Sequence, residues 1–241
     1  MIVFPALDLR QGLGLSGDPV ALALRWADEG ARWLHVVNLD GAAGEASQNR
    51  AAMRRIVQAL ESRGVSIQFG GGLRTIDEVD EALGWGVARV VVDTAFNSAE
   101  FLGAAVTRHG ADRIVADISA RAGKVVVAEW QTGHEVAPLD LARRLKELGI
   151  KRIVYTDIAR VGTQQGADIA RLGELAQKSG LYVIAAGGIG SPDHLIQLRW
   201  IEPYGVEGVI VRRALYEGSL KLRGALESLR QGVGLEGTRG N

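Results

Sequence analysis

The segment Gln68-Phe69-Gly70-Gly71-Gly72-Leu73-Arg74 places three glycines directly after a short apolar run. A glycine pair follows an apolar run in the same way much later, in Val183-Ile184-Ala185-Ala186-Gly187-Gly188. After each glycine run come a helix-like segment and another apolar run, which ends at Asp93 in the first copy and at Arg212 in the second. With Gly70 matched to Gly187, the copies lie about half the chain apart, and a repeat of that period predicts two half-domains of one architecture.

Glycines in such places suit the binding of anions. Between a buried strand and a helix they let backbone N–H groups approach a ligand closely, and the N-terminus of the helix adds a favourable dipole. The alternative is that they only form tight turns from strand to helix. Because the pattern occurs twice, we favour phosphate binding, and two such sites predict a ligand with two phosphates.

Eight short apolar runs alternate with helix-like segments along the chain. In Ala51–Arg63, Leu139–Leu148 and Ile169–Lys178, apolar residues recur at three- and four-residue spacing, as in helices. Alternating strands and helices imply a parallel sheet, and eight units predict an α/β fold that closes into a single (β/α)8 TIM barrel with a two-fold internal repeat. We expect residues 1–231 to form this one domain and residues 232–241 to form a flexible tail. The expected strands are Ile2–Asp8, Trp33–Leu39, Val65–Phe69, Arg89–Thr94, Arg113–Ile118, Arg152–Asp157, Tyr182–Ala186 and Gly208–Arg212.

Composition excludes several classes of protein. The 241 residues are 47% hydrophobic and include 28 acidic residues, 28 basic residues and no cysteine. Balanced charge argues against nucleic acid or an anionic membrane as a partner. The lack of cysteine excludes disulfides, thiolate metal sites and a cysteine nucleophile. Because no apolar run is long enough to span a membrane and the amino terminus lacks the basic region of a signal peptide, we expect a cytoplasmic protein.

Polar residues near the carboxyl ends of the strands are the candidates for function, because chemistry sits at that end of a TIM barrel. A carboxylate that closes an apolar strand, as Asp8 does, costs burial energy unless it is used or paired. The alternative for Asp8 is an ion pair with Arg10, and Asp40 could simply form a turn with Gly41. The candidates are Asp8, Asn38, Asp40, Gln68, Asp93, Thr94, Asp117, Ser119, Thr156, Asp157, Arg212 and Arg213.

Longer motifs extend over nearly the whole chain. They are Pro5–Leu9, Leu34–Ala42, Gln68–Arg74, Trp130-Gln131-Thr132-Gly133, Tyr155–Ile158, Gly187-Gly188 and Ala214–Gly218. Together they resemble the ProFAR isomerase family of the histidine-biosynthesis β/α barrels. The sister cyclase family is a poorer match, since its first strand and its sixth-strand motif read differently.

The resemblance implies an Amadori rearrangement, in which an aminoaldose attached to an imidazole carboxamide becomes an aminoketose. A general acid opens the ribose ring, a Schiff base forms, and a general base removes the proton from the adjacent carbon. No metal or cofactor is expected. Asp8 matches the family's catalytic carboxylate on the first strand, Thr156 matches an assisting threonine on the sixth, and Trp130 would cover the substrate. The resemblance and the repeat together assign substrate and phosphate binding to Gly70, Gly71, Gly72, Arg74, Thr94, Trp130, Gly187, Gly188, Arg212 and Arg213.

Two expected acid/base groups are absent from the matching positions. The family's sixth loop carries an aspartate where this chain has Val161, which can transfer no proton. The fifth strand usually has an aspartate where this chain has Ser119, although Asp117 points to the same face two residues earlier. We therefore take Asp117 as the third candidate catalytic residue. The loop from Arg10 to Pro19, which is long in the family, is short here.

The phosphate sites also depart from the family, which has glycine where this chain has Asp93 and Arg212. A carboxylate within about 4 Å of a phosphate would repel it by roughly 1 to 4 kcal/mol. Arg212 could instead bind a phosphate or fill the space that glycine leaves. The sequence thus predicts an isomerase acting on a phosphorylated small molecule, and a monomer. The alternative is a diverged paralogue that binds a phosphorylated or anionic ligand, either without catalysis or as an enzyme with an altered substrate.

Overall fold

The computed structural model describes residues 1–15, 17–44, 49–125 and 136–231. Trp130 and the predicted tail, residues 232–241, lie outside these ranges. Within the described ranges, no helix is both long and apolar enough to cross a membrane.

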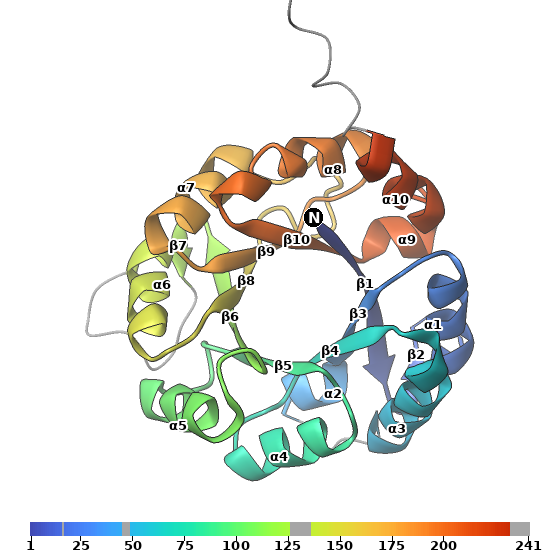
Figure 1. Ribbon diagram of the computed structural model, residues 1–241, viewed down its shortest axis with the longest axis horizontal. Coiled ribbons are helices and arrows are strands. Elements are labelled where there is room, and N and C mark those ends of the chain that lie inside the picture. Colours follow the sequence, from blue (N-terminus) through green and yellow to red (C-terminus); the bar gives the residue numbers. More distant parts are fainter. Residues whose placement is uncertain (16, 45–48, 126–135, 232–241) are drawn as a thin grey trace, which may run out of the picture.

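A closed parallel β-barrel forms the centre of the fold, as the alternating pattern predicts (Figure 1). Each barrel strand pairs with its neighbours in parallel, and the pairing of the last strand with the first closes the ring. Two short strands, β2 (Leu13–Gly14) and β7 (Lys124–Val125), fold back antiparallel on the ends of β1 and β6. The barrel strands are β1 (Ile2–Arg10), β3 (Trp33–Asn38), β4 (Ser66–Gly70), β5 (Arg89–Asp93), β6 (Ile114–Arg121), β8 (Arg152–Asp157), β9 (Tyr182–Ala186) and β10 (Val206–Val211).

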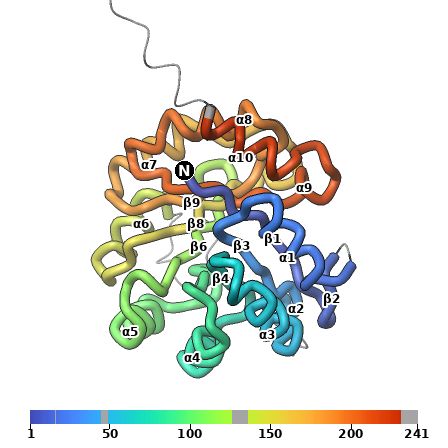
Figure 2. The backbone as a smooth tube through the Cα atoms, turned by 45° about the vertical axis from the view of Figure 1, so that its right-hand side comes forward, coloured from blue at the N-terminus to red at the C-terminus, as the bar shows by residue number. Residues whose placement is uncertain are grey.

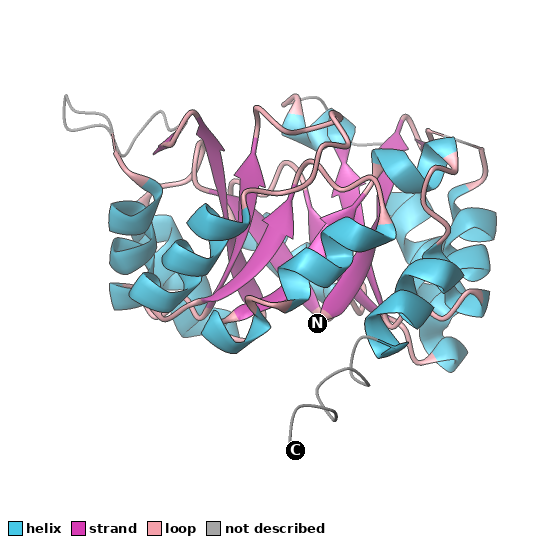
Figure 3. Cartoon of the chain, turned by 90° about the horizontal axis from the view of Figure 1, so that it is seen from above, coloured by secondary structure: helices cyan, strands magenta, loops and turns pink. Residues whose placement is uncertain are grey.

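Helices surround the barrel, and in side view the strands run from the edge at the N-terminus to the opposite edge (Figures 2 and 3). The helices are α1 (Pro19–Asp28), α2 (Leu39–Ala42), α3 (Asn49–Leu60), α4 (Ile76–Gly84), α5 (Ala99–His109), α6 (Pro138–Glu147), α7 (Ile169–Ser179), α8 (Pro192–Arg199), α9 (Arg213–Glu217) and α10 (Leu222–Gln231), with 3-10 turns η1 (Glu61–Arg63) and η2 (Glu202–Tyr204). Their apolar faces pack on the outside of the barrel, where most of the buried hydrophobic residues lie. This packing holds the strand ends, and the side chains on them, in fixed positions.

The two halves of the repeat correspond one residue away from the match that the sequence predicts. Gly71 and Gly72 have φ of 103° and 83°, and Gly187 and Gly188 have φ of 101° and 85°. The counterpart of Gly187 is therefore Gly71, whereas Gly70 is the last residue of β4 and has no positive φ. Matching Gly70 to Gly187 was wrong because the first copy has an extra glycine inside its strand.

These glycines are required by the fold whether or not an anion binds. A Cβ atom on Gly72 would lie 2.6 Å from the Gly41 backbone, and one on Gly188 would lie 2.2 Å from the carbonyl oxygen of Gly166. Both residues also need the left-handed backbone region that favours glycine. Tight turns against a neighbouring loop thus account for the repeated glycines, so phosphate binding needs other support.

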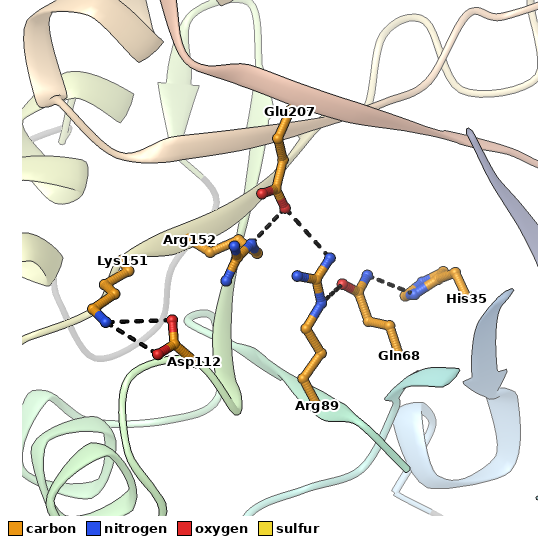
Figure 4. Close-up of polar contacts among 7 residues, drawn as sticks. All are labelled: His35, Gln68, Arg89, Asp112, Lys151, Arg152 and Glu207. Atoms are coloured by element: carbon orange, nitrogen blue, oxygen red, sulfur yellow. Dashed lines mark hydrogen bonds and ion pairs between the residues drawn. The ribbon is translucent and has the colours of Figure 1, made fainter. Parts of the chain in front are cut away.

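Inside the barrel, a small apolar layer separates two polar layers. The layer includes Phe4, Val91, Val115, Val154 and Ile210. On its side towards the carboxyl ends of the strands lies a cavity lined by polar side chains. On its other side lies a buried network of charged and amide groups, which reaches the cavity only through His35 (Figure 4).

That buried network connects five side chains by hydrogen bonds and ion pairs. Glu207 contacts Arg152 Nε at 2.5 Å and Arg89 at 3.4 Å. The Nε atom of Arg89 donates to Gln68, whose amide nitrogen lies 3.1 Å from Nδ1 of His35. A shift of register in β10 between Val206 and Gly208 accompanies the placing of Glu207 inside the barrel.

Candidate functional site

A cavity of about 460 Å³ opens at the carboxyl ends of the barrel strands. Side chains from both halves of the repeat line it. They include His35, Asp93, Asp117, Thr156, Arg212 and Arg213, together with Gly70, Gly71, Gly72, Arg74, Gly187 and Gly188. Most of the predicted site residues therefore meet in one place.

Asp8 does not itself line this cavity, but it forms an ion pair with Arg212, which does. The carboxylate is 3% exposed, and its Oδ2 atom is 3.3 Å from Nε of Arg212. Burial raises the pKa of Asp8, and the guanidinium of Arg212 opposes that rise. The sequence offered Arg10 as the alternative partner, but the partner is Arg212, which the closure of the barrel brings across from β10.

One acceptor atom on Asp8 has no partner among the residues that the structure describes. Within the described ranges, Oδ1 of Asp8 is buried and has no hydrogen-bond partner. Because an unpaired buried acceptor costs roughly 1 to 3 kcal/mol, it marks this carboxylate as a functional group. Arg212 contacts Asp8 through Nε, so its terminal nitrogens remain as possible donors to an anion.

Asp117 faces the cavity from β6, which is diametrically opposite β1 in the ring of strands. Thr156 donates a hydrogen bond to its Oδ1 at 3.2 Å, and the Ser119 hydroxyl lies 3.4 Å from its Oδ2. Burial, together with the charge of Asp93, raises the pKa of Asp117 to about 7, and the two hydroxyls and Arg212 limit the rise. Of the predicted catalytic residues, Thr156 and Asp117 therefore line one cavity, and Asp8 lies on the opposite strand and contacts the cavity residue Arg212.

Asp93 and Thr94 end up in different environments although they are adjacent. Asp93 lines the cavity and accepts a hydrogen bond from the backbone N–H of Ala95 at 2.7 Å. Thr94 is fully buried, and its hydroxyl donates to the carbonyl oxygen of Asp117 at 2.7 Å. The Thr94 side chain thus joins β5 to β6 and does not line the cavity.

His35 is a cavity residue that the strand-end candidates did not include. It is buried, and burial, with help from Arg212 and Arg89, lowers its pKa to about 3, so the imidazole is neutral. Because Arg89 donates to the Gln68 oxygen, the Gln68 amide N–H₂ faces Nδ1 of His35, which assigns the imidazole proton to Nε2. The sequence did contain a signal for His35. It lies between Leu34 and Val36, which face outward, so strand alternation points its side chain into the barrel.

Three other candidates have structural partners. Asp40 Oδ2 accepts hydrogen bonds from the N–H of Gln11 and from Asn49, which fixes the loop after β1. Asp157 accepts from the N–H of Ala159 and pairs with Arg160, and Gln68 belongs to the buried network below the cavity. Asp40 is therefore more than a turn residue, and none of the three lines the cavity.

The two ends of the cavity that the sequence predicts to bind phosphate differ in the groups already present there. At the β4 end, Glu78 accepts hydrogen bonds from the N–H groups of Arg74 and Thr75, so a carboxylate fills the N-terminus of α4. At the β9 end, the N-cap residue of α8, Ser191, makes no side-chain capping bond. An added anion would thus meet less competition at the β9 end.

Cationic side chains flank both ends. Arg74 lies over the ring of Phe96, with its guanidinium carbon 5.0 Å from the ring centroid. At the other end, Arg213 pairs with Glu217 and donates to the carbonyl oxygen of Gly162. Val161, beside that glycine, is 49% exposed and lines the cavity.

Fold and cavity together define a (β/α)8 barrel with carboxylate, hydroxyl and guanidinium groups gathered at the carboxyl ends of its strands, the usual place of the active site in this class. Comparison with known proteins agrees with this class. The sequence profile described as "Histidine biosynthesis protein" matches residues 2–221, and the chain belongs to that family.

Curated relatives match the chain over nearly its full length. A protein of Symbiobacterium thermophilum is 42% identical over 239 residues, which cover 93% of this chain and 95% of the relative. Proteins of Desulforamulus reducens and Moorella thermoacetica are each 40% identical and cover 94% of this chain and 96% and 97% of their own lengths. All three are named 1-(5-phosphoribosyl)-5-((5-phosphoribosylamino)methylideneamino) imidazole-4-carboxamide isomerase, the enzyme that acts on ProFAR.

Proposed function

We propose that this chain catalyses the isomerisation of ProFAR, an Amadori rearrangement from aminoaldose to aminoketose in histidine biosynthesis. The observation that carries the proposal is a pair of carboxylates on opposite strands: the half-buried Asp117, which lines the cavity, and the buried Asp8, whose partner Arg212 lines the same cavity. Relatives of about 40% identity that bear this enzyme's name support it. They give no support to the alternative of a non-catalytic or altered-substrate paralogue.

The reaction needs one group that gives a proton and one that takes a proton. The acid protonates the ring oxygen while its bond to C1 breaks, which leaves a Schiff base between C1 and the nitrogen. The base then removes a proton from C2, and the electrons of that bond form an enaminol. Loss of the hydroxyl proton to the first group, and return of a proton from the second group to C1, give the aminoketose and restore both carboxyl groups.

The residues of this chain can fill these roles although two family positions differ. Val161 and Ser119 carry no acid, but Asp117 lies in the same cavity and holds a pKa near neutrality. A group with a pKa near the working pH is well suited to proton transfer. Thr156 supports Asp117 through its hydrogen bond, and Arg212 holds Asp8.

Turnover by the purified chain tests the proposal directly. We expect conversion of ProFAR to the aminoketose, followed by chromatography of substrate and product, and growth of a histidine auxotroph that lacks the isomerase. A control culture carrying Asp8→Asn should fail to grow. A folded wild-type protein that neither converts ProFAR nor supports growth would remove the proposal.

Phosphate should bind more tightly at the β9 end of the cavity than at the β4 end. Arg213→Gln is expected to weaken the binding of inorganic phosphate about tenfold, because a hydrogen bond to a charged group contributes roughly 1.5 kcal/mol or more. Arg74→Gln, the matched change at the β4 end, should have a smaller effect, since Glu78 and Asp93 already place carboxylates there. Isothermal titration of both variants measures the two affinities, and a larger loss in Arg74→Gln would contradict the assignment.

We also propose that the chain is a monomer located in the cytoplasm. The charge balance and the absence of an apolar segment long enough to span a membrane in the sequence support the location. Light scattering on the purified protein would test the monomer.

A further inference from the structure

Asp93 and Asp117 lie side by side on the wall of the cavity opposite Asp8. β5 and β6 are parallel neighbours, and Asp93 is the direct register partner of Asp117. Two residues before each, Val91 and Val115 point into the barrel, so both carboxylates point inward as well. Since paired strands are about 4.8 Å apart, the two carboxyl groups are neighbours in a confined space.

Within the described residues, the groups that contact Asp93 and Asp117 are neutral hydrogen-bond donors, not cations that would balance their negative charges. Thr156 and Ser119 face Asp117, and the N–H of Ala95 donates to Asp93. Arg212 acts on Asp117 and Arg74 acts on Asp93 through space, but in the part of the chain that the structure describes neither carboxylate has a cation within ion-pair distance. Two adjacent carboxylates in such a place resist carrying two negative charges.

We propose that Asp93 and Asp117 act as a pair that retains one proton at neutral pH. Asp117 is the acid that protonates the ring oxygen of the substrate, and Asp93 is a positioning residue whose charge keeps that proton in place. The proposal rests on the proposed isomerase function for the identity of the reaction. It gives a specific role to Asp93, which the sequence marks as a strand-end candidate and as a source of repulsion for phosphate.

Asp8 completes the arrangement as the base. Burial raises the pKa of Asp93 and the pKa of Asp117, and next to Asp117 the charge of Asp93 raises the pKa further. At Asp8 burial also raises the pKa, but the adjacent Arg212 favours the ionised form. The ion pair with Arg212 therefore favours Asp8 as the base, and the lack, among the described residues, of a cation within ion-pair distance of Asp117 favours Asp117 as the acid. A pair that holds one proton also repels a nearby phosphate less than two full charges would.

A carbon-13 NMR titration of aspartate carboxyl groups tests the pair without any turnover. Asp117→Asn identifies the Asp117 signal in the labelled full-length protein, which we expect to titrate at about pH 7. In Asp93→Asn the midpoint should move to lower pH, by about one pH unit or more, as for strongly coupled groups. A midpoint near the ordinary value of 3.8 in the wild type, or one that Asp93→Asn leaves unchanged, would overturn the proposal.

Stability against pH gives a second readout. A carboxyl group whose native pKa lies above its unfolded value binds more protons in the native state, so the protein loses stability as pH rises from about 4 to about 7. Asp117→Asn should therefore raise Tm at pH 8, and the gain should shrink towards pH 4. Asp157→Asn, which removes the partner of Arg160, should not raise Tm at pH 8. A lower Tm for Asp117→Asn at pH 8 would make Asp117 a structural carboxylate.

Kinetic measurements test the proton-sharing pair separately from the proposed isomerase function. If ProFAR is converted, the alkaline limb of the kcat profile should move to lower pH in Asp93→Asn, and activity at high pH should fall about tenfold for each pH unit that the limb moves. An equal loss at every pH would contradict the positioning role of Asp93. If ProFAR is not converted, the NMR and Tm results still decide whether Asp93 and Asp117 share a proton.

Discussion

Asp8→Asn should lower kcat for ProFAR about 10²-fold or more, because an asparagine can neither accept nor return the C2 proton. The change keeps the size of the side chain and a hydrogen-bond acceptor beside Arg212. Binding should be less affected than turnover, since the terminal nitrogens of Arg212 can contact the ligand in both proteins. Steady-state kinetics on the folded variant measure both parameters.

Asp40→Asn is the matched control for this experiment. Asp40 is also a buried carboxylate near the carboxyl end of its barrel strand, but it bonds to Gln11 and Asn49, whereas Asp8 pairs with Arg212 of the cavity wall. We expect its kcat to stay within about threefold of the wild type, in contrast to the loss expected for a proton-transfer group. If Asp8→Asn and Asp40→Asn lose the same small amount, Asp8 is not the base.

The barrel could be predicted because its signals are local. Each strand is a short apolar run and each helix repeats its apolar residues at helical spacing, so eight alternating units suffice to predict the closed sheet. Some strand ends were predicted less well. The strand β6 extends to Arg121, beyond the predicted end at Ile118, because Ala122 and Gly123, both with positive φ, form a turn that pairs β6 with β7. Family motifs then predicted Asp8 and Thr156 as catalytic; Thr156 lines the cavity, and Asp8 contacts the cavity residue Arg212.

The contacts across the barrel could not be predicted, because they depend on closure and register. Asp8 meets Arg212 only because β10 pairs with β1, which are separated by nearly the whole chain. Asp93 becomes the neighbour of Asp117 through the register of β5 on β6. Thr94 was predicted to bind phosphate, yet its hydroxyl bonds to the backbone of β6 because the strand alternation turns it away from the cavity.

The buried network below the cavity is the clearest feature that the sequence did not indicate. Arg89 is only 5% exposed, and its guanidinium carbon lies 4.3 Å from the centroid of the Trp33 ring. Burial lowers the pKa of Arg89 to about 10, and Glu207 opposes that effect. Glu207 is thus the carboxylate that compensates Arg89 and Arg152 together, with its side chain 15% exposed (Figure 4).

Glu207→Ala should therefore lower the free energy of unfolding by about 3 to 5 kcal/mol, because it leaves two guanidinium groups in the barrel without their anion. Asp112→Ala is the matched control, since it removes the exposed carboxylate 3.1 Å from Lys151 at the same end of the barrel and should cost less than about 1 kcal/mol. Urea denaturation followed by circular dichroism measures both. Equal losses in the two variants would show that water already compensates the two arginines. A large loss of stability confined to Glu207→Ala would mean that the ion pairs of Glu207 with Arg89 and Arg152 hold the amino-terminal ends of β5, β8 and β10 together.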